Sequence, residues 1–484
     1  MTAIRFGTSG WRGIIGREFT FDRVEKVIDA IAAFLLAEDR PAAGLHYQPT
    51  VCVGGDTRFL SPELSAMAAE RLASRGFLAL LSDRPVPTPV LSHAVRKIGA
   101  RAAVNFTASH NPALYNGIKF SPFHGGPAGK DVTDAIERHA AGGAGQEDDA
   151  GPASGAKGRV ETRDFIPAYL EDLGALIGWD RIRRCPPRVV YDPFYGTGRG
   201  VLDASLRRHG CAVRTIHDRR DPLFGGKRPE PCEEGLRQLS EEVVRSGASV
   251  GLSTDGDADR FGIVDETGAF VQPHDYLPLL LEYLVLEKGW RGLVVRSLST
   301  GSLMDRVARA HDLPVLETPV GFKYLGAAML EQDVVLAGEE SGGMSVLGHV
   351  PEKDGILACL LAAEMVSARG KGLRAQLEGD LWPTYGRLHN LRMDVDLEDD
   401  TMSLLMERLV RAEPRELAGL PVLSVDRRDG VKLYLEPEDT WVLVRLSGTE
   451  PLARLFFQAA DTGTLDRLVD SVTSMISVKQ DGKR

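Results

Sequence analysis

Short apolar runs alternate with amphipathic stretches along the N-terminal part of the chain. Apolar residues recur every three or four positions over 24–35, the spacing of one helix face, and the apolar run at 51–55 has the length of a buried strand. The same reasoning predicts helices over 24–35, from Ser61 to Gly76 and over 89–98, and strands over 51–55, 77–81 and 102–106. This β-α-β-α-β order favours a mostly parallel sheet covered by helices.

The alternation restarts twice after segment 141–158, which is poor in large apolar residues and typical of a linker or surface loop. One set has strands at 188–192, 211–216 and 249–253 and a helix near 199–208; the next has strands at 293–297, 314–318 and 334–338 and helices at 301–311 and 321–330. The C-terminal part of the chain predicts a smaller α+β unit. It contains the segment 388–395, a helix at 402–412, a strand at 441–446 and a helix at 464–477. At about 150 residues per domain, 484 residues fit three or four domains.

The composition narrows the class of protein. The chain is 43% hydrophobic and 26% charged, as soluble globular proteins are, and its formal net charge of -10 argues against a nucleic-acid partner. We expect no membrane span, because no window reaches 18 uninterrupted apolar residues. The five cysteines are scattered and the polar N-terminus does not resemble a secretory signal, so a reduced, cytoplasmic setting is expected.

The first unusual polar segment, Thr107 to Pro112, follows the strand at 102–106. Ser109 is a candidate nucleophile with His110 beside it. Lys119, on the next segment, is a candidate proton shuttle or phosphate contact. A polar turn and a solvated lysine are the alternative interpretation of these residues.

The second segment places Asp255, Asp257 and Asp259 directly after the strand at 249–253. Three carboxylates at alternate positions, separated by glycine and alanine, repel one another unless a hard cation lies between them. Magnesium suits this arrangement better than calcium, because Mg²⁺ keeps coordination positions open for phosphate oxygens. Arg260 follows and offers a forked contact to phosphate.

Two further polar segments follow predicted strands. The glycine-rich segment 338–343 contains Glu339 and Ser341, which suit sugar hydroxyls, while Lys353 farther along either faces the same cleft or is exposed near a helix start. The segment after 441–446 gathers groups that donate to phosphate, namely Arg445, Ser447, Gly448, Thr449 and Arg454. Near the N-terminus, Arg12 lies between glycines and is a candidate contact for a phosphate on Ser109. Ligands of open α/β sheets lie beyond the carboxyl ends of strands, so we expect these segments to form one site.

Taken together, these segments resemble the α-D-phosphohexomutase superfamily, in order and over essentially the whole chain. The phosphoserine loop resembles TASHNP, the metal loop DGDADR, the sugar loop GEESGG and the phosphate loop RLSGTEPLAR. The resemblance implies three similar helix-covered mixed α/β domains and a C-terminal α+β domain, TATA-binding-protein-like, around a central cleft. The expected domains span 1–150, 159–270, 271–382 and 383–484.

The resemblance also implies a role for each motif residue. The groups that would hold Mg²⁺ are the phosphorylated serine and the three aspartates: Ser109, Asp255, Asp257 and Asp259. Those that would line the transfer site are Arg12, His110, Lys119 and Arg260. Those that would bind the sugar hydroxyls and the non-reacting phosphate are Glu339, Ser341, Arg445, Ser447, Gly448, Thr449 and Arg454.

Within the superfamily, GEES together with EKDG looks closest to the phosphoglucomutases. Gly343 stands where phosphomannomutases and phosphoglucosamine mutases more often carry a histidine, so His349 or Lys353 would take over its role. The proton-transfer group is therefore open among His110, Lys119 and Lys353.

The resemblance predicts reversible interconversion of glucose 1-phosphate and glucose 6-phosphate through a phosphoserine and a hexose 1,6-bisphosphate, which also acts as activator. The expected partner is a phosphorylated hexose, with no nucleic acid or membrane, and the expected state is a monomer or homodimer. Related alternatives are a phosphomannomutase, a dual-specificity phosphohexomutase or a hexose-bisphosphate synthase. Alternatives of other classes are a metal-dependent phosphatase with an aspartyl nucleophile and a non-catalytic phosphosugar-binding protein.

Overall fold

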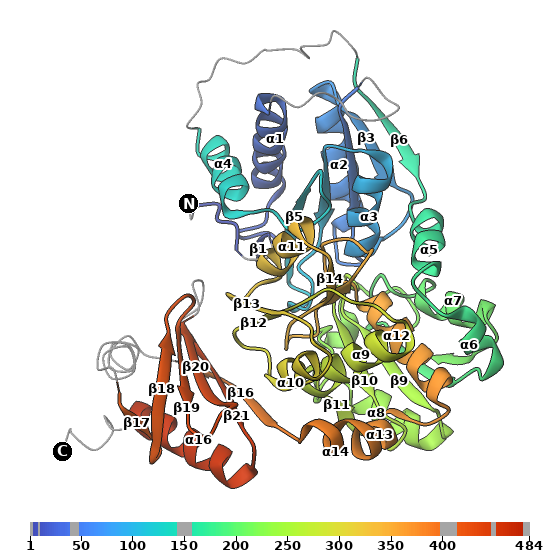
Figure 1. Ribbon diagram of the computed structural model, residues 1–484. Coiled ribbons are helices and arrows are strands. Elements are labelled where there is room, and N and C mark those ends of the chain that lie inside the picture. Colours follow the sequence, from blue (N-terminus) through green and yellow to red (C-terminus); the bar gives the residue numbers. More distant parts are fainter. Residues whose placement is uncertain are drawn as a thin grey trace.

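The computed structural model describes residues 3–7, 10–38, 48–142, 157–396, 414–446 and 452–477, and it arranges them around four β-sheets (Figure 1). The predicted helix at 402–412 lies outside the described residues, as do Ser447, Gly448 and Thr449. Each sheet with its helices is named below as the first to the fourth unit, in chain order.

The first sheet has the order β1-β5-β4-β2-β3-β6. Its strands are β1 (Trp11–Ile14), β2 (Thr50–Gly55), β3 (Leu78–Ser82), β4 (Ala102–Phe106), β5 (Tyr115–Pro122) and β6 (Arg159–Arg163); its helices are α1 (Phe21–Ala37), α2 (Ser61–Ser74), α3 (Thr88–Ile98) and α4 (Lys130–Ala140). The three predicted strands are β2, β3 and β4, which pair in parallel, whereas β5 and β1 return antiparallel. The second domain was expected to start at residue 159, but β6 pairs with β3 and so extends the first sheet.

The second sheet has the order β11-β10-β9-β7-β8. Its strands are β7 (Arg188–Asp192), β8 (Ala212–Thr215), β9 (Val250–Thr254), β10 (Phe261–Val264) and β11 (Phe270–Val271); its helices are α5 (Ile166–Gly174), α6 (Trp179–Arg184), α7 (Leu202–Arg208), the 3-10 turn η1 (Phe224–Gly226) and α8 (Arg237–Ser246). Strand β9 pairs in parallel with β7 and antiparallel with β10, so the segment between β9 and β10 is a tight hairpin turn.

The third sheet has the order β13-β12-β14-β15. Its strands are β12 (Leu293–Ser297), β13 (Val315–Thr318), β14 (Val334–Gly338) and β15 (Met344–Val346); its helices are α9 (Pro273–Glu287), α10 (Leu303–Ala310), α11 (Phe322–Glu331), α12 (Gly355–Arg369), α13 (Leu373–Gln376), the π-turn η2 (Leu377–Leu381) and α14 (Trp382–Tyr385). Helix α12 is apolar on nearly every face and almost wholly buried, as expected for a helix in the centre of a large protein.

The fourth sheet, with the order β16-β21-β20-β19-β18-β17, is antiparallel, and helix α16 packs on one of its faces (Figure 1). Its elements are β16 (His389–Asp396), β17 (Glu416–Leu417), β18 (Leu420–Asp426), β19 (Val431–Leu435), β20 (Thr440–Leu446), β21 (Leu452–Ala459) and α16 (Thr462–Ser477). This all-antiparallel unit differs from the other three, as the sequence predicted.

One apolar core joins the first three units. It runs from Leu80 through Leu252 to Leu336 and includes most of α12. The fourth unit has a core of its own between its sheet and α16. Its apolar contact with the third unit is a small cluster, Leu298 with Trp441, Leu443 and Phe456. The first three units therefore form one packed body, to which the fourth is attached more lightly.

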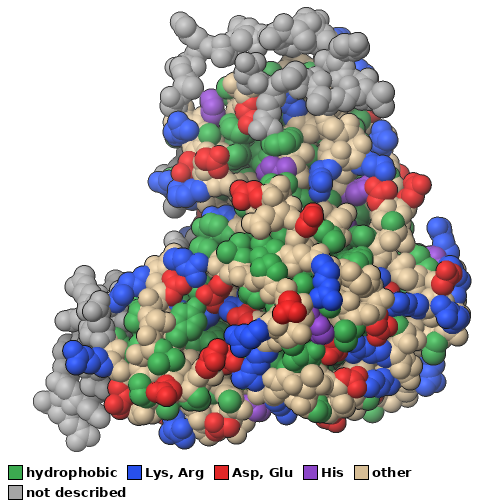
Figure 2. All heavy atoms as spheres, in the orientation of Figure 1, with side chains coloured by type: hydrophobic (Ala, Val, Ile, Leu, Met, Phe, Trp, Pro, Cys, Tyr) green, Lys and Arg blue, Asp and Glu red, His purple; other side chains and the backbone are tan. Residues whose placement is uncertain are grey.

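The surface carries charges of both signs. On the face in Figure 2, lysine and arginine side chains are interspersed with aspartate and glutamate over all the described units. This mixture accords with the modest net charge of the whole chain.

Candidate active site

Ser109 lies in the turn after β4, with its side chain buried. Its backbone has a φ of 51°, in the left-handed region, and its N–H donates to Thr107 Oγ1 at 2.9 Å. Its hydroxyl donates to Asp255 Oδ2 at 2.6 Å and lies 3.5 Å from His110 Nδ1. The structure thus brings the serine into contact with a carboxylate 146 positions away in the chain.

A buried arginine holds the loop that carries Ser109. The Arg58 guanidinium is fully buried and donates to the carbonyl oxygens of Ser109 (2.6 Å), Asn111 (2.7 Å) and Tyr115 (3.0 Å). Asp56 accepts from Arg58 Nε at 3.0 Å, and burial raises the pKa of this carboxyl while Arg58 opposes the rise. Sequence reasoning missed this pair, although two opposite charges directly after β2 were its signal.

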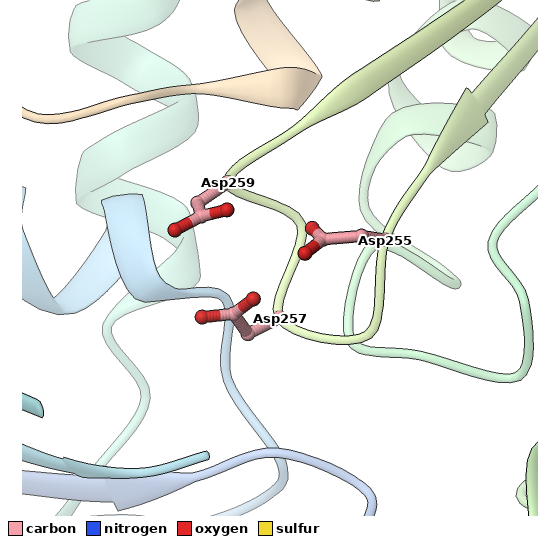
Figure 3. A group of neighbouring side chains, drawn as sticks. All are labelled: Asp255, Asp257 and Asp259. Atoms are coloured by element: carbon pink, nitrogen blue, oxygen red, sulfur yellow. The ribbon is translucent and has the colours of Figure 1, made fainter. Parts of the chain in front are cut away.

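The three aspartates occupy the hairpin turn between β9 and β10. Their carboxylates point toward one another (Figure 3), and one oxygen of each lies within 4.8 Å of the others. All three side chains are buried. Burial, followed by the negative charges of Asp257 and Asp259, raises the pKa of Asp255 well above its usual range. The turn therefore concentrates negative charge that requires a positive counterpart.

Two lysines supply part of the positive charge that balances the three aspartates. Lys119 Nζ lies 2.5 Å from Asp257 Oδ2 and 2.6 Å from Asp259 Oδ2, and Lys353 Nζ lies 3.2 Å from Asp259 Oδ2. Burial lowers the pKa of each lysine, but the carboxylates outweigh it and raise each pKa above its ordinary value. Lys119 reaches the aspartates from β5, an antiparallel strand that the sequence did not predict.

The remaining carboxylate oxygens fit a divalent cation. Asp257 Oδ1 and Asp259 Oδ1 are buried, and within the described part of the chain neither has a hydrogen-bond partner. A buried acceptor without a partner is unfavourable, and hard cations such as Mg²⁺ prefer carboxylate oxygens. The donor set of Asp255, Asp257 and Asp259 is therefore compatible with magnesium.

Thr88, at the start of α3, orients one of these carboxylates. Its hydroxyl donates to Asp257 Oδ2 at 2.5 Å, its N–H donates to the Asp257 carbonyl at 2.9 Å, and it accepts from Asn105 Nδ2 at 2.8 Å. The first unit thus fixes the conformation of a turn that belongs to the second. No local sequence signal indicated this role, because the two residues are 169 positions apart.

Positively charged side chains also lie beside the loop that carries Ser109. Arg12, on β1, donates from Nη1 to Asn111 Oδ1, and burial together with the charge of Arg260 lowers the pKa of Arg12 to about 10. Burial, then Arg260 and Arg12, lowers the pKa of His110 well below its ordinary value, which disfavours its protonation. Two arginine charges beside this histidine favour an anion such as phosphate.

The loop after β14 faces this cluster. Glu339 is buried and accepts from the Gly321 N–H at 2.9 Å, while the Phe261 N–H donates to the Gly342 carbonyl at 2.9 Å. Ser341 is half-buried. Burial and the charge of Glu340 raise the pKa of Glu339 to about 7. The candidate sugar loop is thereby fixed to the strand that follows the three aspartates.

Gly343 explains how Lys353 enters the site. A Cβ atom at position 343 would lie 2.4 Å from Lys353 Cδ, so a side chain there would displace the lysine. His349, the other candidate for the missing histidine, is instead hydrogen-bonded to Asp354 Oδ2 at 2.7 Å and packs near the Tyr169 ring. Of the two candidates, the geometry places Lys353 at the aspartates.

The raised pKa of Glu339 predicts a pH-dependent stability. Between its ordinary pKa of 4.5 and about 7, the folded protein keeps a proton that the unfolded chain releases, so stability falls as pH rises through this window. Glu339→Gln removes the ionisation. Relative to wild type, we expect this variant to gain about 3 kcal/mol between pH 4.5 and 7, as 2.5 pKa units imply. Chemical unfolding of metal-free protein across this range measures it, and a constant difference between the two proteins would contradict it.

Arg445 and Arg454 lie in the fourth unit, directly opposite one another on β20 and β21. Like charges at such positions repel, so both need anionic neighbours. Arg445 Nη2 lies 3.0 Å from Asp429 Oδ1, and Arg454 Nε lies 3.8 Å from Asp394 Oδ2. The pair forms a cationic end of the sheet that precedes the predicted phosphate loop, of which Ser447, Gly448 and Thr449 are outside the described residues.

Family models match along the chain in the order of the four units. The phosphoglucomutase/phosphomannomutase alpha/beta/alpha domains I, II and III match residues 3–146, 167–268 and 272–385, and the C-terminal domain of the same family matches 408–475. The chain belongs to the phosphoglucomutase/phosphomannomutase family. Members of this phosphohexomutase family are enzymes, so the expected enzyme class and the four-unit architecture are confirmed.

Relatives and solved phosphohexomutases resemble the chain over its whole length. A Thermococcus kodakarensis protein named "Phosphoglucomutase/phosphomannomutase" is 32% identical over 94% of both chains. A Methanobrevibacter smithii protein named "Probable phosphoglucosamine mutase" is 31% identical over 97% of this chain and 98% of its own. The structure of a Thermus thermophilus protein named as a phosphomannomutase has a TM-score of 0.83 at 34% identity, covering 98% of this chain and 99% of that one. These names differ in the sugar, so the family alone leaves the hexose open.

Two further observations bear on the expected setting of this phosphohexomutase. No helix in the ranges that the structure describes is both long and apolar enough to cross a membrane. All five cysteines are free thiols.

Proposed function

We propose that the protein interconverts glucose 1-phosphate and glucose 6-phosphate through a phosphate carried on Ser109 and a glucose 1,6-bisphosphate intermediate. One observation carries the proposal: the Ser109 hydroxyl, 2.6 Å from Asp255, adjoins a buried cluster of three carboxylates. A phosphoryl group on that oxygen would lie close to the carboxylates, and Arg12 and Arg260 would supply positive charge to it. Phosphoryl transfer needs such positioning and charge stabilisation more than any other contribution.

Transfer begins with the phosphate on Ser109. The bond from phosphorus to Ser109 Oγ breaks while a bond from phosphorus to the free hydroxyl oxygen of the hexose forms, and the hydroxyl proton would pass to His110, which returns it to Ser109 Oγ. Lys119, Arg12 and Arg260 would stabilise the charge on the equatorial oxygens. Mg²⁺ held by the aspartates would withdraw further charge from the phosphoryl group.

Two groups are placed to move protons. His110, whose pKa is lowered, lies 3.5 Å from Ser109 Oγ, so it is suited to accept the hexose proton and pass it to the serine oxygen. Lys353 lies against both Asp259 and Gly343 of the sugar loop, and the surrounding carboxylates raise its pKa, so it is suited to donate a proton to a sugar oxygen and not to accept one. Lys119, enclosed by two carboxylates, serves better as a fixed charge.

The fourth unit would hold the phosphate that does not react. Arg445 and Arg454, with Ser447, Gly448 and Thr449 of the following loop, supply the donors, and Glu339 and Ser341 would bind the sugar hydroxyls. The bisphosphate must present first one end and then the other to Ser109. A fourth unit joined by a small apolar cluster can accommodate this exchange.

Magnesium binding should stabilise the enzyme measurably. At a hundredfold excess of Mg²⁺ over its dissociation constant, we expect wild type to gain about 2.7 kcal/mol. Asp257→Asn should lose this gain, because it removes one of three charges from the cation site. Thermal unfolding with and without Mg²⁺ measures the effect, with the exposed Asp180→Asn as matched control. An equal gain in Asp257→Asn and wild type would place the cation elsewhere.

The choice of glucose is supported by GEES with EKDG and by the lysine that Gly343 admits. Steady-state rates on glucose, mannose and glucosamine 1-phosphates test it, and a higher kcat/KM on mannose or glucosamine 1-phosphate would overturn the choice of sugar. The same assays distinguish a mutase from a metal-dependent phosphatase, because a phosphatase releases inorganic phosphate and a mutase does not. We also propose a reducing, cytoplasmic setting and a primer that is a hexose 1,6-bisphosphate.

A further inference from the structure

Asp429, in the turn between β18 and β19, contacts two units at once. Its Oδ1 accepts from Arg445 Nη2 at 3.0 Å within the fourth unit. Its Oδ2 accepts from the Val320 N–H at 2.9 Å in the third unit. One carboxylate therefore joins the candidate phosphate arginine to the backbone of another unit.

The contact with Val320 leads directly to the sugar loop. The next residue, Gly321, donates its N–H to Glu339 Oε1 at 2.9 Å. Gly321 has a φ of 128°, a backbone conformation that favours glycine. A short path of hydrogen bonds thus runs from Arg445 through Asp429 and the 320–321 backbone to Glu339.

Arg445 needs the orientation that Asp429 provides. It stands directly opposite Arg454, whose positive charge repels it. Among the described residues, no hydrogen-bond partner meets Arg445 Nε, although this atom is buried. Asp429 therefore fixes the guanidinium through Nη2.

Other contacts attach the fourth unit without Asp429. Glu317 of the third unit accepts from Lys432 Nζ at 2.7 Å and from the Tyr434 hydroxyl at 2.6 Å, and Gln458 Oε1 accepts from the Ser302 N–H at 2.9 Å. Removal of one carboxylate should therefore leave the two units docked.

We propose that Asp429 is a positioning residue for phosphosugar binding: anchored on the Val320 N–H of the third unit, it aims Arg445 at the non-reacting phosphate. The proposal rests on the phosphate-binding role given to Arg445 under the proposed function. Asp429 touches no reacting atom, so it acts on the Michaelis complex rather than on phosphoryl transfer at Ser109.

The test is steady-state kinetics on glucose 1-phosphate with the full-length chain. Asp429→Ala should raise KM about tenfold to a hundredfold, the range for loss of a hydrogen bond to a charged group, and should change kcat much less. Asp429→Asn keeps one acceptor oxygen and should restore part of the lost affinity. Glu438→Ala, which removes an exposed carboxylate 3.4 Å from Arg309 at the same interface, is the matched control and should leave KM unchanged.

A double-mutant cycle with Arg445→Ala decides how Asp429 acts. If Asp429 works through Arg445, adding Asp429→Ala to Arg445→Ala should raise KM no further. A further rise in the double variant would overturn the proposal, as would an unchanged KM in Asp429→Ala alongside a raised KM in Arg445→Ala. An unchanged KM in Arg445→Ala itself would instead refute the phosphate-binding role on which the proposal rests.

Discussion

Replacing Ser109 with alanine is expected to reduce turnover of glucose 1-phosphate by a factor on the order of a million, the scale seen when covalent enzymes lose their nucleophile. The expected loss is large because no second hydroxyl carries the phosphoryl group in the proposed reaction. The variant should fold normally, since the serine hydroxyl donates only to Asp255 and alanine is smaller. A coupled assay for glucose 6-phosphate, together with thermal unfolding, measures both quantities.

The matched control is Ser92→Ala, which removes another buried hydroxyl of the first unit. Ser92 Oγ has no hydrogen-bond partner in the part of the chain described, so the control should retain wild-type turnover. Phosphopeptide mapping of wild type should locate an acid-stable phosphate on Ser109. Appreciable turnover by Ser109→Ala, or an acid-labile phosphate on an aspartate, would refute the role given to this serine.

Arg58→Ala is expected to destabilise the protein by about 3–5 kcal/mol, the range for removing one partner of a buried ion pair. The loss has two sources: Asp56 becomes a buried charge without its partner, and the carbonyl oxygens of Ser109 and Asn111 lose their donor. Turnover should fall as well, because these carbonyls hold the serine loop. Chemical unfolding and kcat of the same preparation report both effects.

Two other variants test the role of Arg58: one keeps its charge but changes its geometry, and the other removes an exposed arginine as a control. Arg58→Lys keeps the charge but not the planar fork, so its stability and turnover should lie between those of wild type and Arg58→Ala. Arg84→Ala removes an exposed arginine whose nearest partner, Asp83, is 2.7 Å away, and it should cost less than about 1 kcal/mol. Equal losses from Arg58→Ala and Arg84→Ala would show that burial of the Arg58 pair contributes nothing.

The sequence predicted the elements whose formation depends on residues close together in the chain. Strands β2, β4 and β9 are short, mostly apolar segments that are buried at every position, and polar turns follow where each strand ends. The three aspartates could be recognised as a candidate cation site because their repulsion depends only on their own spacing. The first sheet is mixed and mostly parallel, as predicted, but the sequence did not predict the antiparallel strand β5 that brings Lys119 to the site.

The residues that sequence reasoning missed act over long distances in the chain. Thr88 orients Asp257 from another unit, and Asp429 joins Arg445 to Val320. Thr88 lies at a helix start and Asp429 in a turn, as polar residues often do. Hydrophobic periodicity and motif spacing therefore do not indicate these contacts. For Arg58, the sequence showed a charged residue just after a strand, but it did not predict that this side chain is buried.

The continuous core of the first three units has a consequence for the course of the reaction. The serine, the aspartates and the sugar loop all belong to that single body, whereas Arg445 and Arg454 belong to the lightly attached fourth unit. In the proposed reaction, a bisphosphate could therefore be released at one end and captured again at the other while the serine, the aspartates and the sugar loop stay assembled. Each catalytic cycle would then change only the contacts between the fourth unit and the first three, and the groups proposed to perform the chemistry would need no reassembly before the second transfer.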